Sequence, residues 1–494
     1  MARRPIARTA TGIAGVDSVL HGGLPAGQMF LVDGSPGVGK TTFAMQFLLE
    51  GVRRGERCLY VTLSETRSEL EAVAESHDWK LDGIDVIELS QIEGHFNLRS
   101  QNTLFQSSEI ELTGLSDLLV AEFERIKPAR MVLDSLSEVR LMAQNPLRYR
   151  RQILAFKQHF AGAGCTVLML DDRSAQGQDA QVQSIVHGML TMQTVPLKFG
   201  INRRFLTIPK MRGSAFREGN HDYVIKRGGL VVYPRLVAAE KAGTFERETF
   251  RSGNEQLDRL MGGGIDAGTG TLFMGPAGSG KSTVASMFAS HAARHGCKVL
   301  YFAFDEVKSI LMHRAQEIGL DFAGAVKSGM LEIRQVDPAE IAPGELADEL
   351  HRAVAEDDVR RGVLDSRNGY VNAMPQEEFL HLHLHELLTY LNQNGVATIM
   401  VLAQHGLVGP MGAPVDVSYL ADSVLLTRYF EARGAMKKAL SLVKKRSGAH
   451  EDTIRELSLT GSGIVVGPPL IDFEGVMTGV PRFLGGTQSG HGEA

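Results

Sequence analysis

The chain contains one eight-residue pattern twice, first as Gly34-Ser35-Pro36-Gly37-Val38-Gly39-Lys40-Thr41 and again as Gly275-Pro276-Ala277-Gly278-Ser279-Gly280-Lys281-Ser282. Each copy reads Gly, four residues, then Gly-Lys and a hydroxyl residue, and the two lysines are 241 positions apart. The glycines of such a loop let successive backbone N–H groups turn toward an anion, the lysine reaches the outer phosphates of a nucleotide, and the hydroxyl is a ligand for Mg²⁺. The pattern therefore predicts two sites for ATP with Mg²⁺, each extended by the next residue, Thr42 or Thr283.

The residues around each loop fit the strand–loop–helix setting that this chemistry needs. Residues 29–32 and 271–274 predict buried strands before the loops, and residues 43–49 and 284–289 predict helices after them. A helix that begins at the loop adds the positive end of its dipole to the phosphate site. A chance glycine-rich turn is the alternative, but it does not explain two matches in equivalent settings.

The repetition extends well beyond the loops. Residues 16–27 match 257–268, and the apolar segment 58–63 matches 299–304, again with an offset of 241. Further apolar segments follow in both halves at 130–134, 165–170, 362–365 and 397–402. Strands that alternate with helices build a parallel, doubly wound sheet that binds ligands at the carboxyl ends of its strands.

We therefore predict an α/β protein with two tandem P-loop domains, each on a mainly parallel sheet. The expected boundaries are residues 1–240, 241–467 and a flexible C-terminal tail at 468–494. Asp134 and Asp365 end apolar segments downstream of the two loops, where a P-loop protein holds its second Mg²⁺ ligand. The predicted metal ligands are Thr41, Ser282, Asp134 and Asp365. Asp172 also ends a predicted core strand near the first loop, as a sensor of the nucleotide or as an ordinary polar strand end.

The composition argues against several classes of protein. The net charge of −5 disfavours a protein that coats nucleic acid through bulk charge, although a local basic rim stays open. The three cysteines, Cys58, Cys165 and Cys297, form no Cys-x-x-Cys pair and are expected to be reduced. The sequence shows no apolar run long enough to span a membrane. A cytoplasmic protein is expected.

Four segments give the chain a resemblance to the KaiC family, two-domain clock ATPases of the RecA/DnaB superfamily. The segments are 21–27 (His-Gly-Gly-Leu-Pro-Ala-Gly), 210–214 (Lys-Met-Arg-Gly-Ser), 431–434 (Glu-Ala-Arg-Gly) and 444–447 (Lys-Lys-Arg-Ser). The resemblance covers roughly residues 8–480. It implies RecA-like domains in a double-ring homohexamer, with ATP between neighbouring subunits. It also implies that a neighbour's Lys-x-Arg pair touches the phosphates, here Lys210 with Arg212 and Lys444 with Arg446; a solvated basic strand is the alternative.

The resemblance also assigns catalytic acids. KaiC proteins carry a glutamate pair after the second core strand, where this chain has Ser64-Glu65 and Asp305-Glu306. A carboxylate there orients water or accepts a proton during in-line attack, so Glu65, Asp305 and Glu306 join Lys40 and Lys281 as predicted catalytic residues. Because Ser64 replaces one acid of the first pair, the first site is expected to hydrolyse ATP more slowly. A plain surface position is the alternative for Glu65.

Autophosphorylation is a further expectation from the resemblance. The family phosphorylates a Ser-Thr pair in its second ring, and Ser418 and Tyr419 stand at that place here. The tyrosine hydroxyl lies farther from the backbone than a threonine hydroxyl, so Ser418 is the expected acceptor and Tyr419 the second. A KaiB-type partner fits the resemblance. The chain ends soon after the regulatory loop 473–482, so a KaiA-type activator is not required.

Two other functions stay open at this stage. One is a nucleic-acid motor or recombinase of the same superfamily, although the extra N-terminal helical domain of replicative helicases and a cysteine cluster are both missing from the sequence. The other is a scaffold that uses ATP for assembly without kinase activity. Binding of single-stranded DNA that depends on salt would favour the first, and unchanged turnover after loss of Glu65 and Glu306 would favour the second.

Overall fold

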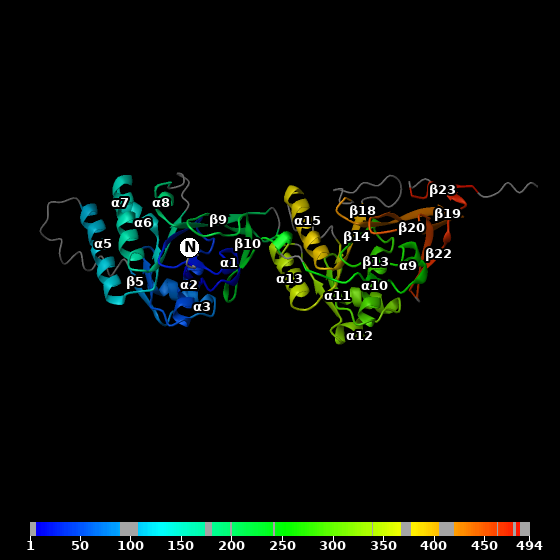
Figure 1. Ribbon diagram of the computed structural model, residues 1–494, viewed down its shortest axis with the longest axis horizontal. Helices are drawn as coiled ribbons and strands as arrows, with labels where there is room; N and C mark the ends of the chain where they lie inside the picture. The colour runs from blue at the N-terminus through cyan, green and yellow to red at the C-terminus, as the bar shows by residue number, and fades with distance from the viewer. Residues whose placement is uncertain are drawn as a thin grey trace, which may run out of the picture. The chain divides into compact units, whose positions relative to one another are not determined.

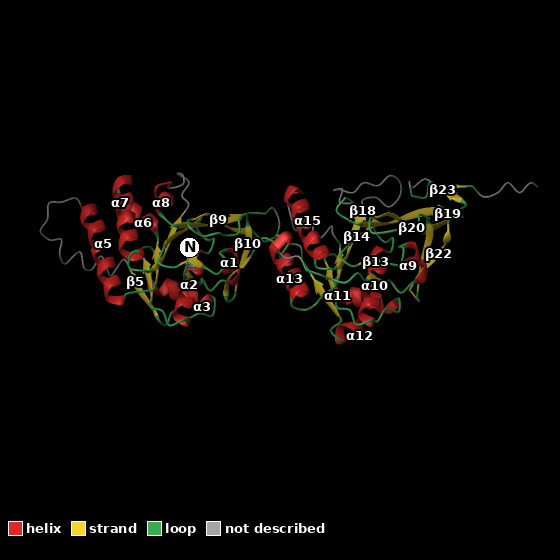
Figure 2. Cartoon of the chain, viewed as in Figure 1, coloured by secondary structure: helices red, strands yellow, loops and turns green. Residues whose placement is uncertain are grey.

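The computed structural model describes residues 6–88, 107–172, 180–197, 200–240, 243–337, 339–366, 377–404, 419–461, 463–477 and 481–484 (Figure 1). The chain divides into two compact units, Met1–Arg235 and Leu236–Ala494, called here the N-terminal and the C-terminal unit. The division falls before residue 240 because Leu236 and Ala238 pack into the apolar core of the C-terminal unit. Each unit is an α/β fold, in which helices flank one large sheet (Figure 2).

The sheet of the N-terminal unit has nine strands. Their order is β11 (Gly229–Tyr233), β10 (His221–Lys226), β9 (Arg203–Met211), β8 (Gly188–Val195), β3 (Met29–Gly34), β7 (Thr166–Asp172), β6 (Arg130–Asp134), β4 (Cys58–Thr62) and β5 (Ile84–Glu88). The strands from β8 to β5 run parallel, and β9 to β11 continue the sheet in antiparallel pairs. This confirms the predicted mainly parallel sheet.

Helices cover both faces of this sheet because its central strands are apolar on both sides. In β3, Phe30 and Val32 join one core while Met29 and Leu31 join the other. The first face carries α1 (Ala14–Val19), α2 (Lys40–Arg53) and α3 (Arg67–Ser76). The second carries α5 (Ser107–Ile126), α6 (Leu136–Ala143), α7 (Pro146–Phe156), the π-helical turn η2 (Lys157–Ala161) and α8 (Ala180–Ile185).

The C-terminal unit repeats this order strand for strand. Its sheet runs β22 (Gly463–Pro469), β21 (Arg455–Thr460), β20 (Ala435–Lys445), β19 (Ser423–Ala432), β14 (Gly270–Pro276), β18 (Ala397–Gln404), β17 (Arg361–Asp365), β15 (Val299–Ala303) and β16 (Leu331–Gln335). One face carries α9 (Glu255–Leu260), α10 (Lys281–Arg294), α11 (Lys308–Glu317) and α12 (Phe322–Lys327); the other carries α13 (Pro343–Ala355) and α15 (Glu377–Gln393).

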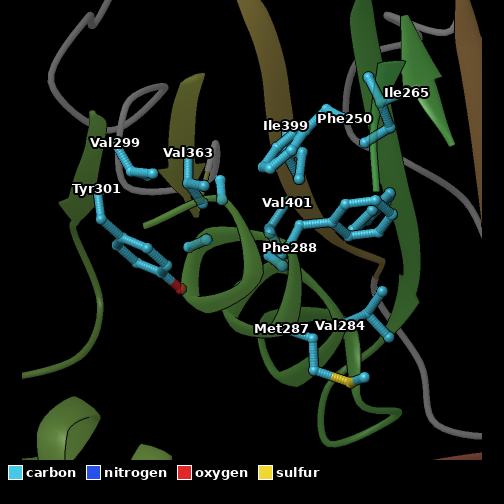
Figure 3. Close-up of a cluster of buried hydrophobic side chains, with 14 of the residues drawn as sticks. Phe250, Ile265, Val284, Met287, Phe288, Val299, Tyr301, Val363, Ile399 and Val401 are labelled. Atoms are coloured by element: carbon cyan, nitrogen blue, oxygen red, sulfur yellow. The ribbon is translucent and has the colours of Figure 1, made fainter. Parts of the chain in front are cut away.

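The helix that follows each P-loop anchors the loop to its sheet. In the C-terminal unit, Val284, Met287 and Phe288 of α10 pack under Ile399 and Val401 of β18 (Figure 3). Phe288 is fully buried and meets Phe250 edge to face, with ring centroids 5.2 Å apart. Burying an aromatic side chain of this size stabilises a fold by about 1.5–3 kcal/mol. The loop is thus held between a rigid strand and a rigid helix.

Small elements complete the two units. Two-stranded pairs form from β1 (Arg8–Thr9) with β2 (Leu24–Pro25), β12 (Thr249–Phe250) with β13 (Ile265–Asp266), and β23 (Phe473–Glu474) with β24 (Arg482–Phe483); η3 spans Ala238–Glu240. The strands β23 and β24 lie in the region where a flexible tail was expected after residue 467. Val476, between these strands in the sequence, is fully buried with Phe430 and Phe473 beside it. Among the described helices, none has the length and apolar character needed to cross a membrane.

Candidate nucleotide sites

Both P-loops connect a central strand to a helix. β3 leads through the loop to α2, which begins at Lys40, and β14 leads to α10, which begins at Lys281. In the first loop Gly37 and Gly39 have φ of 80° and 99°, and Gly278 and Gly280 of the second have 74° and 99°. Residues with a side chain rarely adopt such angles, so the glycines are needed for this turn. The N-terminus of each helix then faces the loop, as an anion site requires.

The P-loop lysines are buried. Lys40 is 8% exposed and Lys281 5% exposed. Lys40 Nζ donates to the carbonyl oxygens of Gly34 at 2.9 Å and Ser35 at 3.1 Å, and Lys281 Nζ donates to that of Pro276 at 2.6 Å. Burial lowers the pKa of Lys281 to about 8. Each ammonium group is thus held at the loop whose phosphate it is expected to bind.

Asp172 lies at the first loop. Its Oδ1 is 2.7 Å from Lys40 Nζ, and the register of β3 with β7 pairs Asp172 with Gly34. In the C-terminal unit the corresponding register pairs Gly275 with Ala403, so this ion pair has no counterpart at that position. Of the two interpretations of Asp172, a contact with the nucleotide site is the one that its position supports.

The expected metal ligands meet in both units. Thr41 Oγ1 is 3.5 Å from Asp134 Oδ2, and Ser282 Oγ is 3.0 Å from Asp365 Oδ1. Burial raises the pKa of both aspartates. A hydroxyl and a carboxylate form the hard oxygen set that Mg²⁺ prefers, and the charge of the ion would offset the cost of burying each carboxylate. The residues present therefore fit a magnesium ion bound together with nucleotide phosphates.

A tyrosine supports each of these aspartates. Tyr60 donates its hydroxyl to Asp134 Oδ2 at 2.7 Å, and Tyr301 donates to Asp365 Oδ2 at 2.6 Å. Both tyrosines are buried in the core strands β4 and β15. The sequence does not single out these tyrosines, because an isolated tyrosine in an apolar strand is typical of a core position. Their separation, again 241 positions, is the signal that could have found them.

Glu65 lies three residues after the last residue of β4, Thr62. The Thr62 hydroxyl accepts a hydrogen bond from the Glu65 backbone N–H at 2.9 Å and donates to its carbonyl oxygen at 2.7 Å. The side chain is half-buried, and among the described residues its buried Oε2 has no hydrogen-bond partner. Burial, followed by the negative charges of Asp134, Glu69 and Asp172, raises the pKa of Glu65. A carboxylate that is more basic than usual and free at one oxygen can orient a water molecule and accept its proton.

Glu306 occupies the same position after β15 but is engaged. Arg314 of α11 binds both of its oxygens, with Nε 3.1 Å from Oε1 and Nη2 2.7 Å from Oε2. Nη1 of the same guanidinium donates to Thr283 Oγ1 at 3.3 Å, next to the P-loop serine. The neighbouring Asp305 is exposed and accepts a hydrogen bond from the Ser366 hydroxyl. Sequence reasoning did not single out Arg314.

Lys210 and Arg212 lie at the opposite end of the sheet from the P-loop of their own unit. Met211 of β9 pairs with Gly188 of β8, which is in register with Phe30 at the start of β3. The loop leaves β3 only at Gly34, so the separation along the strand is four residue steps, or roughly 13 Å. Lys210 Nζ donates instead to the Gln183 carbonyl oxygen, and Arg212 Nη2 to that of Ser184 at 2.8 Å.

Lys444 and Arg446 repeat this placement in the C-terminal unit. Lys445 pairs with Ser423 of β19, which is in register with Thr271 near the start of β14. Lys444 Nζ donates to the Ala421 carbonyl oxygen at 2.6 Å, and Arg446 Nη2 donates to that of Tyr419 at 3.1 Å. Neither Lys-x-Arg pair is therefore brought to the nucleotide loop of its own unit.

Of the two expected phosphoacceptors, Tyr419 is within the described residues and Ser418 is not. Tyr419 is 53% exposed and lies beside Arg446, at the end of the sheet away from its own P-loop. Ser418 lies outside the described residues. The structure thus locates the second expected acceptor at an accessible place and leaves the first as a prediction.

Comparison with known proteins gives one consistent result. The profile of a protein family described as "ATPase: KaiC" matches residues 9–237 and 250–471. The chain is 26% identical to the circadian clock protein KaiC3 of a Synechocystis species, over 97% of this chain and 95% of that protein. It is 26% identical to the circadian clock oscillator protein KaiC of Parathermosynechococcus lividus, over 97% and 88%, and 25% identical to that of a Prochlorococcus marinus strain, over 97% and 96%.

Proposed function

The chain belongs to the KaiC family of ATPases, and from that premise we propose that it works as a homohexamer of two stacked rings that hydrolyses ATP between neighbouring subunits. Family membership implies the use of ATP with Mg²⁺. The hexamer, the residue roles, the autokinase activity and the clock-like role are parts of this proposal.

One observation carries the proposal. Each unit holds a P-loop at one end of its sheet and a Lys-x-Arg pair at the other, roughly 13 Å away along the strands. The lysine and arginine cannot reach the phosphates of their own unit from there. A ring in which each unit offers its P-loop to one neighbour and its Lys-x-Arg pair to the other would complete every site. Cations supplied from a neighbour stabilise charge on a transferring phosphoryl group.

The residues of each site then have distinct tasks. Lys40 and Lys281 hold the outer phosphates, and the pairs Thr41 with Asp134 and Ser282 with Asp365 hold Mg²⁺. The ion neutralises phosphate charge when bound. Glu65 orients the attacking water in the N-terminal ring, and Asp305 with Glu306 serves in the C-terminal ring. Lys210, Arg212, Lys444 and Arg446 supply positive charge from the neighbouring subunit.

We further propose that the C-terminal ring phosphorylates itself at Ser418, with Tyr419 as a second acceptor. The acceptor oxygen bonds to the γ-phosphorus as the bond to the bridging oxygen breaks, ADP leaves, and the hydroxyl proton passes to the Asp305–Glu306 pair. The contact of Arg446 with the Tyr419 carbonyl supports this, because it holds Tyr419 beside the cations that would meet a neighbour's ATP. Such a slow modification suits a cytoplasmic timing or signalling switch that a KaiB-type partner reads, without a required KaiA-type activator.

Native mass measurement of the full chain tests the assembly. With a non-hydrolysable ATP analogue and Mg²⁺ we expect a hexamer that carries nucleotide, and the variant R212A with R446A should assemble less completely at the same concentration. The variant R54A with R352A, which removes two exposed arginines that each pair with an acid four residues earlier, serves as a matched control. Monomers that bind nucleotide at full occupancy would contradict the proposal.

Mass analysis of the chain after incubation with Mg-ATP tests the kinase. The wild-type chain should gain one phosphate or more, S418A should lose most of that gain, and S418A with Y419F should lose all of it. A gain that is unchanged in the double variant would overturn this part of the proposal and leave the ATPase assignment intact.

A further inference from the structure

Besides Ser64 in place of Asp305, the two units differ at a position on the helix that follows the catalytic acid. α3 and α11 have the same length and lie at the same offset of 241 residues, so Arg314 corresponds to Val73. Val73 is half-buried and packs against the apolar core of the N-terminal unit. Among the described residues, Glu65 therefore has no guanidinium in the place where Arg314 binds Glu306, although both acids follow equivalent strands.

From this difference we infer that Arg314 restrains Glu306 and makes the C-terminal site the slower ATP hydrolase of the two. The inference rests on the proposed function, because it concerns the acids to which that function assigns the attacking water. It reverses the expectation from the sequence that the N-terminal site is slower, which counted the acids of each site and did not include their partners.

The contacts that Arg314 makes explain how it restrains Glu306. Arg314 is 26% exposed and Glu306 27% exposed on their side chains, and a bidentate guanidinium–carboxylate contact in such a setting is stronger than one in open water. The third contact, to Thr283 at the start of α10, ties the arginine to the P-loop helix. Glu306 is thus fixed in place through Arg314, and its two oxygens are shared with the guanidinium.

The groups around each acid act in opposite directions. Glu306 has Arg314 from α11 and the carboxylates of Asp365 and Asp305, so a cation dominates its surroundings at contact distance. Glu65 has Asp134, Glu69 and Asp172 as like charges, with Lys40 as the smaller opposing influence. Burial and these like charges raise the pKa of Glu65, so Glu65 is a stronger proton acceptor than an ordinary glutamate.

The restraint on Glu306 affects the two possible phosphate acceptors, water and a protein hydroxyl, to different extents. A water molecule is mobile and depends on the carboxylate for its orientation, whereas a hydroxyl of the protein is positioned by its own chain. Holding Glu306 therefore slows attack by water more than attack by a tethered hydroxyl. Arg314 is a positioning residue in this account, and it biases the C-terminal site toward keeping its ATP for the protein acceptor.

The direct test removes the arginine from a chain in which the N-terminal site is silent. In the K40A background, R314V should raise the kcat of ATP hydrolysis on the order of tenfold, the factor by which a charge-assisted hydrogen bond shifts an equilibrium. The KM should stay within about twofold, and so should the affinity for a non-hydrolysable ATP analogue, because Lys281 and Ser282 are held by contacts that do not involve Arg314. R314Q provides a second, more conservative variant if R314V folds poorly.

Two controls separate restraint from a general structural effect. R334V removes a side chain of similar exposure, 27%, whose guanidinium binds Glu332 and Glu349 instead, and should leave the hydrolysis rate unchanged. In the E306Q background R314V should have no effect on the rate, because the group through which it acts is gone. A rate that rises equally with and without Glu306 would overturn the inference.

The reciprocal change tests the same idea in the N-terminal unit. V73R in the K281A background should lower the hydrolysis rate of the first site, and it should lower the pKa of Glu65, so that the acid side of the pH–rate profile moves to lower pH. A shifted profile distinguishes an ion pair with Glu65 from a damaged fold.

The outcomes keep this inference apart from the proposed function. If neither K40A nor K281A reduces turnover, the ATPase sites themselves are misassigned. If both reduce it but R314V and R314Q leave or lower the C-terminal rate, the sites stand and the restraint by Arg314 is refuted.

Discussion

The N-terminal and C-terminal units build their proposed nucleotide sites from corresponding residues but differ around the proposed catalytic acid. In both, a P-loop lysine is buried, a hydroxyl meets an aspartate, and a tyrosine supports that aspartate from the neighbouring strand. Around the acid the two units differ, because Glu65 Oε2 has no hydrogen-bond partner within the described part of the chain and Glu306 is bound by Arg314. The comparison teaches that a repeated fold can preserve binding while it separates the activities of its two sites.

The largest expected effect comes from the P-loop lysines. K40A should abolish turnover at the first site and K281A at the second, since each removes the cation that holds the outer phosphates, a contribution of about 10²–10³-fold in rate. Phosphate release by each single variant then reports the other site alone. We expect K40A to lose the larger share of the total. Equal losses would show that the difference in the acids has no consequence for the rate.

Replacing Glu65 and Glu306 compares how much each acid contributes to the hydrolysis rate of its own site. E65Q should slow the first site about a hundredfold, the lower end of the range for a general base. E306Q should cost the second site less, about tenfold, because its carboxylate is already held by Arg314. Single-turnover hydrolysis in the K281A and K40A backgrounds measures the two ratios separately. A larger ratio at the second site would reverse the assigned order.

Lys281 predicts that nucleotide binding at the second site depends on pH. Burial lowers the pKa of Lys281 to about 8. Triphosphate favours the charged lysine, so binding at the second site takes up a proton above pH 8, and affinity should fall by up to about tenfold for each further pH unit. Below pH 8 the affinity should be flat.

Titration of a fluorescent ATP analogue with the K40A and K281A variants measures this dependence. The C-terminal site, which K40A leaves intact, should weaken on crossing pH 8. An affinity of the K40A variant that stays flat above pH 8 would contradict this role of Lys281.

The smallest effect should be the same in both units. Y60F and Y301F each remove one hydrogen bond to a buried aspartate, and each should reduce the free energy of unfolding by about 1–3 kcal/mol. Denaturant unfolding of each variant measures this free energy. Matched losses would confirm that the supports of the metal site are equivalent, and a loss in one unit alone would extend the asymmetry to that site.

The sequence predicts features that depend on neighbouring residues better than features that depend on contacts between separate elements. The loops, the strands before them and the aspartates Asp134 and Asp365 obey local patterns, so the α/β fold with two mainly parallel sheets was predicted correctly. The grip of Arg314 on Glu306 joins residues on either side of a strand-to-helix turn, and a list of charged residues does not reveal it. Only the repeat, read position by position, marks Val73 and Arg314 as the difference.

Two other features could not be predicted from local patterns. Lys210 and Arg212 were identified only through the family resemblance, and the strand register shows that they lie away from the P-loop of their own unit. Val476 was expected in a flexible tail, but an apolar cluster with Phe430 holds it, and such a contact between distant segments leaves no periodic signal in a Gly- and Pro-rich stretch.

Mixing two inactive chains tests the central claim, that neighbouring subunits complete each other's nucleotide sites. One chain carries K40A with K281A and keeps its Lys-x-Arg pairs; the other carries R212A with R446A and keeps its P-loops. Separated without nucleotide and reassembled together with Mg-ATP, they should regain hydrolysis that neither shows alone, because some interfaces then join an intact loop to intact cations. A mixture that assembles and stays inactive would contradict the account.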